Sequence, residues 1–412
     1  MRIGHLLTIC ILLALPAAAQ TPEEAARANA TLPASARAPS PDDPALILTR
    51  RLDLERYKAT IKALTRFGDR RQGTQRNRDA LDWIEAQLKS YGCGNTERLT
   101  YQFGAEPIHY VAAAKSNDSG APQFNVGGGR ARGFSRPTGV NTDAMAQPDA
   151  RLRALDAPPA VPGARQEVWC TKIGTAHPGE MYIVGAHFDG IGWGEAANDD
   201  GSGTALVMEL ARVFASPNVK TDRSIRFILW NNEETGTNGS RAYVEQRALL
   251  QGKEIPTGSG RYPEPKWLGM IQHDMMLFDH GMPRADGSLA KTQRPEADVN
   301  VEFQSMSKFA EESQKLAWAL EEANEKYATD YPVSVGRHMT NTDSGAFMDI
   351  APAVSVRENE RGVQVGNGWD PQWHQPTDLY ATYDDKDFRL GLNAAQTTLS
   401  AVARLAGATV NH

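Results

Sequence analysis

The sequence predicts an α/β fold with a mixed, mostly parallel central sheet and helices on both faces. Short apolar runs of strand length alternate along the chain with longer segments whose apolar residues recur at helical spacing. Several of the apolar runs end abruptly in acidic residues or histidine. Such alternation is typical of a helix-covered parallel sheet, which places its chemistry at the carboxyl ends of its strands.

Length and composition limit the class of protein. The chain has 412 residues, which suits one large α/β domain with an accessory segment. Its net charge is −6, and acidic and basic residues are mixed along the sequence. Because there is no basic excess to attract phosphate groups, we expect no nucleic-acid partner.

The N-terminus has the pattern of a signal peptide over residues 1–19. Arg2 forms a short basic region, residues 6–15 form an apolar core, and three alanines at 17–19 precede a cleavage site before Gln20. The apolar core is too short to span a bilayer as a mature helix, although a retained membrane anchor is the alternative. We therefore expect a periplasmic or secreted protein with no stable membrane association after signal cleavage.

The rest of the chain divides into a tail and one domain. Residues 20–45 are rich in alanine, proline and arginine without a period, which predicts a disordered tail or linker. Residues 46–412 are expected to form a single domain with an irregular insertion at about 104–162, where glycine, proline and alanine are frequent. The polar segment 279–300 is either a loop that shapes a substrate site or a surface excursion.

Strands and helices are expected to alternate through this domain. The expected strands are residues 98–103, 167–173, 181–186, 224–230, 267–272 and 352–356. The expected helical segments are residues 46–64, 76–91, 204–214, 235–250, 305–327 and 384–405. Gly92 follows the second of these helices as a stop signal.

Cys93 and Cys170 are the two cysteines of the expected mature chain. Each lies beside a predicted strand, and export would permit a disulfide between them. Two buried free thiols are the alternative. Neither cysteine lies near the residues with metal-binding chemistry, so we assign them no catalytic role.

The stretch around His187 carries the strongest chemical signal. The apolar run 181–186 has the composition of a buried strand, and it ends in His187 and Asp189. Residues two apart on a strand point the same way, so His187 could bind a metal while Asp189 steadies its ring. Ten residues after Asp189 comes Asp199, and the glycines that follow Asp200 open a helix.

Other predicted strands also end in potential metal ligands. The strand 224–230 is followed by Glu233 and Glu234, the strand 267–272 by Asp274, and His374 occurs late in the chain. Carboxylates buried together are costly unless a cation neutralises them. Two histidines and three carboxylates suit a pair of zinc-like ions about 3.5–4 Å apart, with one carboxylate shared. Of the adjacent glutamates, one would bind metal and the other would accept a proton from water.

Each of these residues has an alternative assignment. Asp199 could be only a turn or helix-capping residue, although Asp200 is the better candidate for the cap. Asp274 has a rival in His273, and alternation along the strand places the two on opposite faces. His374 has His338 as its fallback.

Taken together and in order, these motifs resemble metallopeptidase family 28, the co-catalytic zinc peptidases that include secreted bacterial aminopeptidases. The resemblance rests on the following segments: His187-Phe-Asp189, Ala197-Asn-Asp-Asp-Gly-Ser-Gly203, Asn232-Glu-Glu-Thr-Gly236, Asp274, and His374 followed by Asp378. It covers about residues 46–405, with 104–162 and 252–265 as divergent inserts. It implies the zinc-dependent exopeptidase, or phosphorylase/hydrolase-like, fold.

The resemblance also implies a role for each residue and two zinc ions per chain. Asp199 would bridge both ions, His187 and Asp274 would complete one site, and Glu234 and His374 the other. Glu233 would be the general acid/base. Asp189 and Asp378 would orient the two metal-binding histidines, a role that such imidazoles usually require.

The activity implied is that of a secreted two-zinc aminopeptidase. It would hydrolyse the N-terminal peptide bond of peptides with a free N-terminus, through a metal-bridging water and Glu233 as general base. Alternatives with the same broad fold are a single-zinc glutaminyl cyclase and a two-zinc carboxypeptidase or other amide hydrolase. A non-enzymatic receptor-type relative is the last alternative, and such proteins lack metal ligands that are present here.

Overall fold

The computed structural model describes residues 38–104, 140–278, 299–337, 339, 342–358, 370 and 372–411. The expected signal peptide, the tail up to residue 37, and most of the expected insertion (105–139) and polar segment (279–298) lie outside the described residues. Ser40–His412 forms a compact unit. Among the described residues, no helix combines the length and the apolar character needed to cross a membrane.

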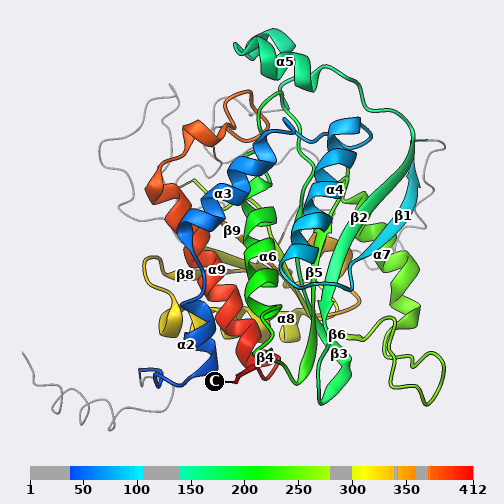
Figure 1. Cartoon of the computed structure of the whole chain (residues 1–412), viewed down its shortest axis with the longest axis vertical. Coiled ribbons are helices and arrows are strands. Elements are labelled where there is room, and N and C mark those ends of the chain that lie inside the picture. Colours follow the sequence, from blue (N-terminus) through cyan, green and yellow to red (C-terminus); the bar gives the residue numbers. More distant parts are fainter. Residues whose placement is uncertain are drawn as a thin grey trace, which may run out of the picture. The chain divides into compact units, whose positions relative to one another are not determined.

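An eight-stranded sheet runs through this unit (Figure 1). In spatial order its strands are β1 (Glu97–Phe103), β2 (Gly163–Lys172), β5 (Arg223–Trp230), β3 (His177–His187), β6 (Lys266–His273), β9 (Ala353–Glu358), β7 (Val299–Phe303) and β8 (Val333–Gly336). The central strands β5, β3, β6 and β9 pair in parallel, whereas β1, β2 and β7 make antiparallel pairs. The predicted mixed, mostly parallel sheet is confirmed, while β7 and β8 were not expected.

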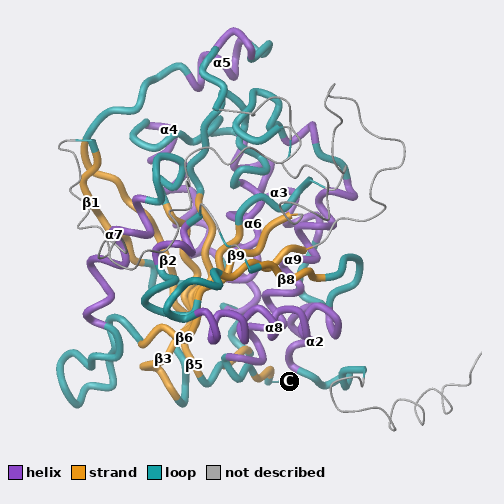
Figure 2. Tube along the Cα trace, turned by 180° about the vertical axis from the view of Figure 1, so that it is seen from behind, coloured by secondary structure: helices purple, strands orange, loops and turns teal. Residues whose placement is uncertain are grey.

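Helices cover both faces of the sheet. The described α-helices are α2 (Pro44–Thr49), α3 (Leu54–Thr65), α4 (Gln75–Ser90), α5 (Ala150–Asp156), α6 (Gly201–Phe214), α7 (Asn238–Arg247), α8 (Ala310–Tyr327) and α9 (Asp385–Leu405). In Figure 1, α3, α4, α6 and α9 lie in front of the sheet. The buried apolar residues of α6, α8 and α9 belong to one core cluster, and those of α7 belong to the cluster on the opposite face, which Figure 2 shows from behind. Strand pair β4 (Val219–Lys220) and β10 (Thr409–Val410) forms a separate small sheet.

The central strands are buried on both faces. On β5, Phe227 and Leu229 pack into the apolar cluster that contains α6, while Ile228 and Trp230 pack into the cluster on the opposite face. Near-continuous apolar runs are what two-sided burial requires of parallel strands. Full burial of one such side chain stabilises the fold by about 1.5–3 kcal/mol, so the sheet gives the strand ends a rigid base.

The first helical segment differs from its expected form. The structured chain begins before residue 46, because Asp43 caps α2 at its N-terminus. The expected helix 46–64 is two helices, since the Asp53 side chain caps a new start by accepting a hydrogen bond from Arg56 N at 2.8 Å. The apolar spacing continues across the break, which is why periodicity alone merges α2 and α3.

The described end of the expected irregular insertion is ordered and partly helical. It contains the 3-10 turn η3 (Ala144–Ala146) and α5, which Asp149 caps. Asp156 accepts a hydrogen bond from Asp69 N at 3.1 Å and lies 3.5 Å from Arg76 Nε. This part of the insertion is therefore attached to the loop before α4.

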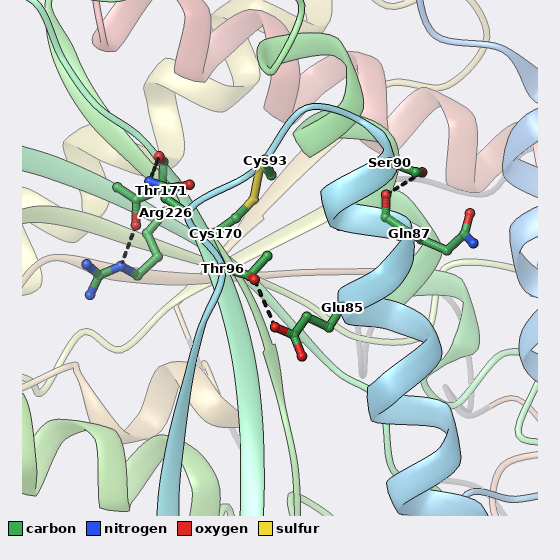
Figure 3. Close-up of a disulfide and its surroundings, with 9 residues drawn as sticks. Glu85, Gln87, Ser90, Cys93, Thr96, Cys170, Thr171 and Arg226 are labelled. Carbon is green, nitrogen blue, oxygen red and sulfur yellow. Dashed lines mark hydrogen bonds between the residues drawn. A yellow bond between two sulfur atoms is a disulfide. The ribbon is translucent and has the colours of Figure 1, made fainter.

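A disulfide joins Cys93 and Cys170, as one of the two sequence expectations predicted (Figure 3). Cys93 follows the C-terminus of α4, and Cys170 lies on β2. Both residues are buried in the core cluster. The bond therefore connects a surface helix to the sheet, across a separation of 77 residues in the sequence.

Removing this cross-link should lower stability substantially. In the chain-entropy model, closing a loop of this length raises the free energy of the unfolded chain by about 4.5 kcal/mol. We expect the double variant Cys93→Ala and Cys170→Ala to lose a comparable part of its free energy of unfolding, measured by denaturant titration. Comparing oxidised with reduced wild-type protein separates the cross-link from the lost side-chain volume, and equal stability of these two forms would contradict the expectation.

Candidate metal centre

Three neighbouring strands bring the candidate residues to one edge of the sheet. His187 is the last residue of β3 and pairs in register with Trp230, the last residue of β5. Asp274 comes directly after the end of β6. Because β5, β3 and β6 are adjacent and parallel, their carboxyl ends meet at this edge. The turn with Glu233 and Glu234, which follows β5, therefore lies beside them.

Asp199 lies between the two candidate histidines. It belongs to the loop between β3 and α6 and is 4% exposed. Its Oδ1 lies 3.4 Å from His187 Nε2, and its Oδ2 lies 3.0 Å from His374 Nε2. Each oxygen of one carboxylate thus faces a different imidazole.

The remaining candidate ligands divide between the two histidines. Asp274 Oδ1 lies 3.8 Å from His187 Nε2, and Glu234 Oε2 lies 2.7 Å from His374 Nε2. His187, Asp199 and Glu234 each offer a donor atom within 4.8 Å of the other two. The structure therefore brings all five predicted metal ligands together, in two sets that share Asp199.

This donor set fits zinc. Imidazole nitrogens and carboxylate oxygens bind zinc at about 2.0–2.2 Å, so a tetrahedral site spaces its ligand atoms about 3.3 Å apart. The distances of 2.7–3.8 Å between the donors bracket that spacing. Glu234 Oε1 is buried without a hydrogen-bond partner among the described residues, which leaves it available to a cation.

The electrostatics of the centre also favour a cation. Burial and the Asp199 carboxylate raise the pKa of Glu234 to about 7, and burial with nearby carboxylates raises the pKa of Glu233. Burial alone would lower the pKa of His187 and of His374, but the surrounding carboxylates raise both. Protons thus compensate the negative charge when no cation is bound, and metal binding would displace them.

The adjacent glutamates occupy different environments. The Glu234 side chain is 3% exposed and contacts His374. Glu233 and Glu234 are both partly exposed as whole residues, but in the described part of the chain the Glu233 carboxylate makes no contact within 4 Å with either histidine. Its backbone N–H donates to Asp189 Oδ1 at 3.0 Å, which fixes the turn. The two glutamates therefore have different neighbours, and their division into a ligand and a proton acceptor stays a prediction.

The expected contact between Asp189 and His187 is made by a different atom. His187 Nδ1 lies 3.0 Å from the main-chain oxygen of Asp189 and 3.8 Å from its Oδ1. The ring N–H therefore donates to the carbonyl, while the carboxylate holds the backbone of Glu233. Asp189 still orients the ring, but through its main-chain carbonyl, which lies next to the imidazole because the chain bends after β3.

The expected contact between Asp378 and His374 is absent, and this prediction is corrected. Asp378 accepts hydrogen bonds from the backbone N–H groups of Asn198 and Asp199 at 2.8 and 3.1 Å, and its Oδ1 lies 3.1 Å from the Tyr383 hydroxyl. His374 Nδ1 is buried without a hydrogen-bond partner among the described residues. Asp378 is engaged by the turn that carries Asp199, so it positions the shared carboxylate rather than the imidazole.

The two rival residues have other functions in the fold. Asp200 caps α6 by accepting a hydrogen bond from Gly203 N at 2.8 Å, as predicted. His273 lies 3.2 Å from the Gly185 carbonyl through Nδ1 and 2.8 Å from Thr398 Oγ1 through Nε2, away from the donor sets. The fallback His338 lies outside the described residues.

Arg357 is a neighbour of the centre that sequence reasoning missed. Its Nη2 lies 2.9 Å from Asp274 Oδ2, and both side chains are almost fully buried. The guanidinium occupies one oxygen of Asp274, which leaves Oδ1 directed toward His187. The signal in the sequence was an arginine near the end of β9, a strand in which every residue is buried.

Asn198 is a second residue that was missed. Its Oδ1 accepts hydrogen bonds from the backbone of Met276 and Leu277 at 2.8 and 2.9 Å. Its Nδ2 donates to Glu358 at 3.0 Å and to Asp370 at 2.9 Å. The amide therefore links the loop before α6 to the segment after Asp274, directly behind the shared carboxylate.

Arg70 holds the loop that connects the ligands His187 and Asp199. Its buried guanidinium donates to the carbonyls of Phe188, Glu195 and Ala196 at 2.7–2.8 Å, and to Gly68 O at 3.2 Å. All of these acceptors are main-chain oxygens.

The loops around the centre have strained backbones. Every described non-glycine residue with a left-handed φ lies in them: Arg70, Trp193, Ala196, Asn232, Thr237, Met275 and His374. Such conformations cost about 1–3 kcal/mol each and persist only where surrounding contacts enforce them, and they cluster at functional sites.

Comparison with known proteins shows which sequences this chain resembles. Residues 169–397 match the model of peptidase family M28. Aminopeptidase YwaD of Bacillus subtilis is 45% identical over 79 residues, which are 19% of this chain and 16% of that protein. The chain spans less than half the length of the first curated relatives it matches.

Solved structures share the fold at low sequence identity. An aminopeptidase from Aneurinibacillus sp. strain AM-1 has a TM-score of 0.55 and 19% identity, covering 89% of this chain and 97% of that chain. A glutaminyl cyclase from Porphyromonas gingivalis has a TM-score of 0.53 and 14% identity, covering 86% and 98%.

His273 should make stability depend on pH. Burial lowers its pKa from 6.5 to about 4, so between these values the unfolded chain binds a proton that the folded chain does not. The free energy of unfolding should therefore fall as pH falls from about 6.5 to about 4, by about 3 kcal/mol from this group. Denaturant unfolding across this range should show a shallower slope in His273→Gln. His177→Gln, at an exposed position, is the control and should keep the wild-type slope. A wild-type slope in His273→Gln would refute the assignment of this pH dependence to His273.

Arg70 should contribute much more to the stability of the fold than its neighbour Arg71. Arg70→Met removes a donor from four carbonyls, of which only Ala196 O keeps a second one, the Gly201 N–H at 3.1 Å, so we expect a loss of at least about 3 kcal/mol in the free energy of unfolding. The same change at the exposed Arg71 should cost less than about 0.5 kcal/mol. Similar unfolding midpoints for the two variants would contradict the role given to Arg70.

Proposed function

This chain belongs to peptidase family M28, and from that premise we propose that it is an aminopeptidase with two zinc ions. It would hydrolyse the N-terminal peptide bond of peptides that have a free N-terminus. One observation carries the two-ion proposal: the two oxygens of Asp199 face the Nε2 atoms of two different histidines. A single-ion site would not require a second complete donor set.

Five residues would hold the ions. His187 and Asp274 would form one site, Glu234 and His374 the other, and Asp199 would belong to both. When bound, the ions would supply Lewis-acid chemistry, polarising the scissile carbonyl and lowering the pKa of a water molecule. The buried surroundings support this, because charge interactions are stronger where solvent is excluded.

Glu233 would transfer the proton during hydrolysis. It is partly exposed, and it lies beside the ligand Glu234 without contacting either histidine. It would accept the proton of the attacking water and return it to the nitrogen of the leaving amine, so that the peptide bond breaks without releasing an amide anion. The hydrogen bond from its backbone to Asp189 would hold the carboxylate at the correct position.

The glutaminyl cyclase with a similar fold defines the second candidate. A single-zinc cyclase would use one donor set and would cyclise N-terminal glutamine rather than cleave a peptide bond. The completeness of both donor sets around Asp199 favours the peptidase. A carboxypeptidase or another amide hydrolase would keep the two ions and differ in substrate.

We also propose that the protein is exported. The Cys93–Cys170 disulfide supports this, because such bonds persist in oxidising compartments such as the periplasm and the extracellular space. The signal-like pattern of residues 1–19 supports the same location.

Glu233→Gln should separate proton transfer from metal binding. Because Glu233 is not a proposed ligand, the variant should keep about two zinc ions per chain. It should nevertheless lose about 10²–10⁴-fold in hydrolysis of aminoacyl amides, since the proton acceptor is gone. The exposed Glu245→Gln on α7 is the matched control and should hydrolyse at the wild-type rate. Zinc content and initial rates are the measurements.

The same assay distinguishes the other candidates. Chelation should abolish hydrolysis, and zinc should restore it. Cleavage of free-amine substrates but not N-blocked ones would support the aminopeptidase. Activity only on blocked or C-terminal substrates would overturn the substrate class, and cyclisation of N-terminal glutamine with one ion would favour the cyclase. Failure of the reconstituted protein to bind metal would refute the centre itself.

A further inference from the structure

We propose that Gln147, in the described end of the insertion, is a positioning residue for the metal ligand His374. The inference rests on the proposed two-zinc centre and names a residue outside it. The described end of the insertion then supports the His374 site and is not only a surface loop. Three sets of contacts support this.

Gln147 joins three separate segments of the chain. Its side chain is fully buried, and its Nε2 donates to Trp193 O at 2.8 Å and to Pro376 O at 2.9 Å. Its Oε1 accepts a hydrogen bond from Asp149 N at 3.0 Å. Both donor hydrogens of the amide are thus used on carbonyls, one in the loop after β3 and one in the loop that carries His374.

Asn141 extends the same attachment to the ligand itself. Its backbone N–H donates to the main-chain oxygen of His374 at 3.0 Å, and its Nδ2 lies 3.4 Å from Gly192 O. The insertion therefore contacts the backbone of His374 directly and the backbone of the neighbouring loop as well.

The two loops under Gln147 approach each other closely. Gly192 has a φ of +106°, and a Cβ there would lie 2.4 Å from the carbonyl carbon and oxygen of His374. At the other end of the contact, Glu195 N donates to Asp378 O at 2.8 Å. Gln147 thus links the two loops close to His374, whereas the Glu195 hydrogen bond links them at Asp378.

The imidazole of His374 depends on this backbone support. Metal-bound histidines usually donate their second ring nitrogen to a carboxylate or carbonyl, which fixes the ring. His374 Nδ1 has no such partner among the described residues, and Asp378 is engaged elsewhere. The Trp373 ring stacks on the imidazole with 4.0 Å between the ring centroids, and the His374 backbone is left-handed with a φ of 57°. These two features then set the direction of the imidazole. Contacts that hold this backbone therefore hold the ligand.

Gln147→Met tests the proposal, because methionine keeps the length of the side chain but donates no hydrogen bond. We expect one of the two zinc ions to bind about 10- to 100-fold more weakly, while the other keeps its wild-type affinity. Affinities are measured by competition between the metal-free protein and a chromogenic chelator. His374→Ala identifies the ion that belongs to the affected site.

Two further variants keep the test decisive. Asn141→Pro removes the N–H that donates to His374 O and should weaken the same ion, even if Gln147→Met does not fold. Gln246→Met, at an exposed position on α7, is the matched control and should bind both ions as the wild type does. Unchanged affinities for both ions in Gln147→Met, or equal weakening of both, would overturn the inference while leaving the two-zinc function intact. Fewer than two ions in the wild-type protein would instead refute the function on which it rests.

Discussion

The burial of several carboxylates at adjacent strand ends is the constraint on which the rest of the structure depends. Asp199, Glu234 and Asp274 lie within a few ångströms of two imidazoles, in a part of the protein where water cannot stabilise their charge. Such a group is stable only with a cation or with shared protons. The sheet provides the rigid base for it, because β5, β3 and β6 end together and are packed on both faces.

The loops above this base are held mainly by side chains that bind main-chain atoms. Arg70 supplies donors to four carbonyls, and Asp378 and the Asn198 side-chain oxygen each accept from two backbone N–H groups. Loops without regular structure leave their backbone groups unpaired, and burial makes each unpaired group costly. Buried polar side chains replace the missing secondary structure here, and they also enforce the left-handed residues that aim the candidate ligands.

The parts of the structure that could be predicted are those encoded locally. Apolar runs identified the central strands, and the polar residues directly after them identified His187, Glu233, Glu234 and Asp274. The acidic turn before the next predicted helix identified Asp199, and the resemblance supplied its bridging role and the preference for His374. Strands β7 and β8 were missed because they are short and follow segments without a clear pattern. The partner of Asp378 was wrong because no pattern near residue 378 reveals that the backbone 180 residues earlier needs an acceptor. Gln147 and Pro376, 229 residues apart, meet only through the fold.

The way the insertion leaves the sheet has a consequence for how such proteins diverge. Phe103 on β1 pairs directly with Gly163 on β2, so the whole insertion is the connection of one antiparallel hairpin at the edge of the sheet. The disulfide closes the chain around it, between positions 93 and 170. A hairpin connection can change in length at a small entropic cost, which grows only with the logarithm of loop length. Evolution can therefore exchange this module, and with it the support beside His374, without altering the strands that carry the other ligands.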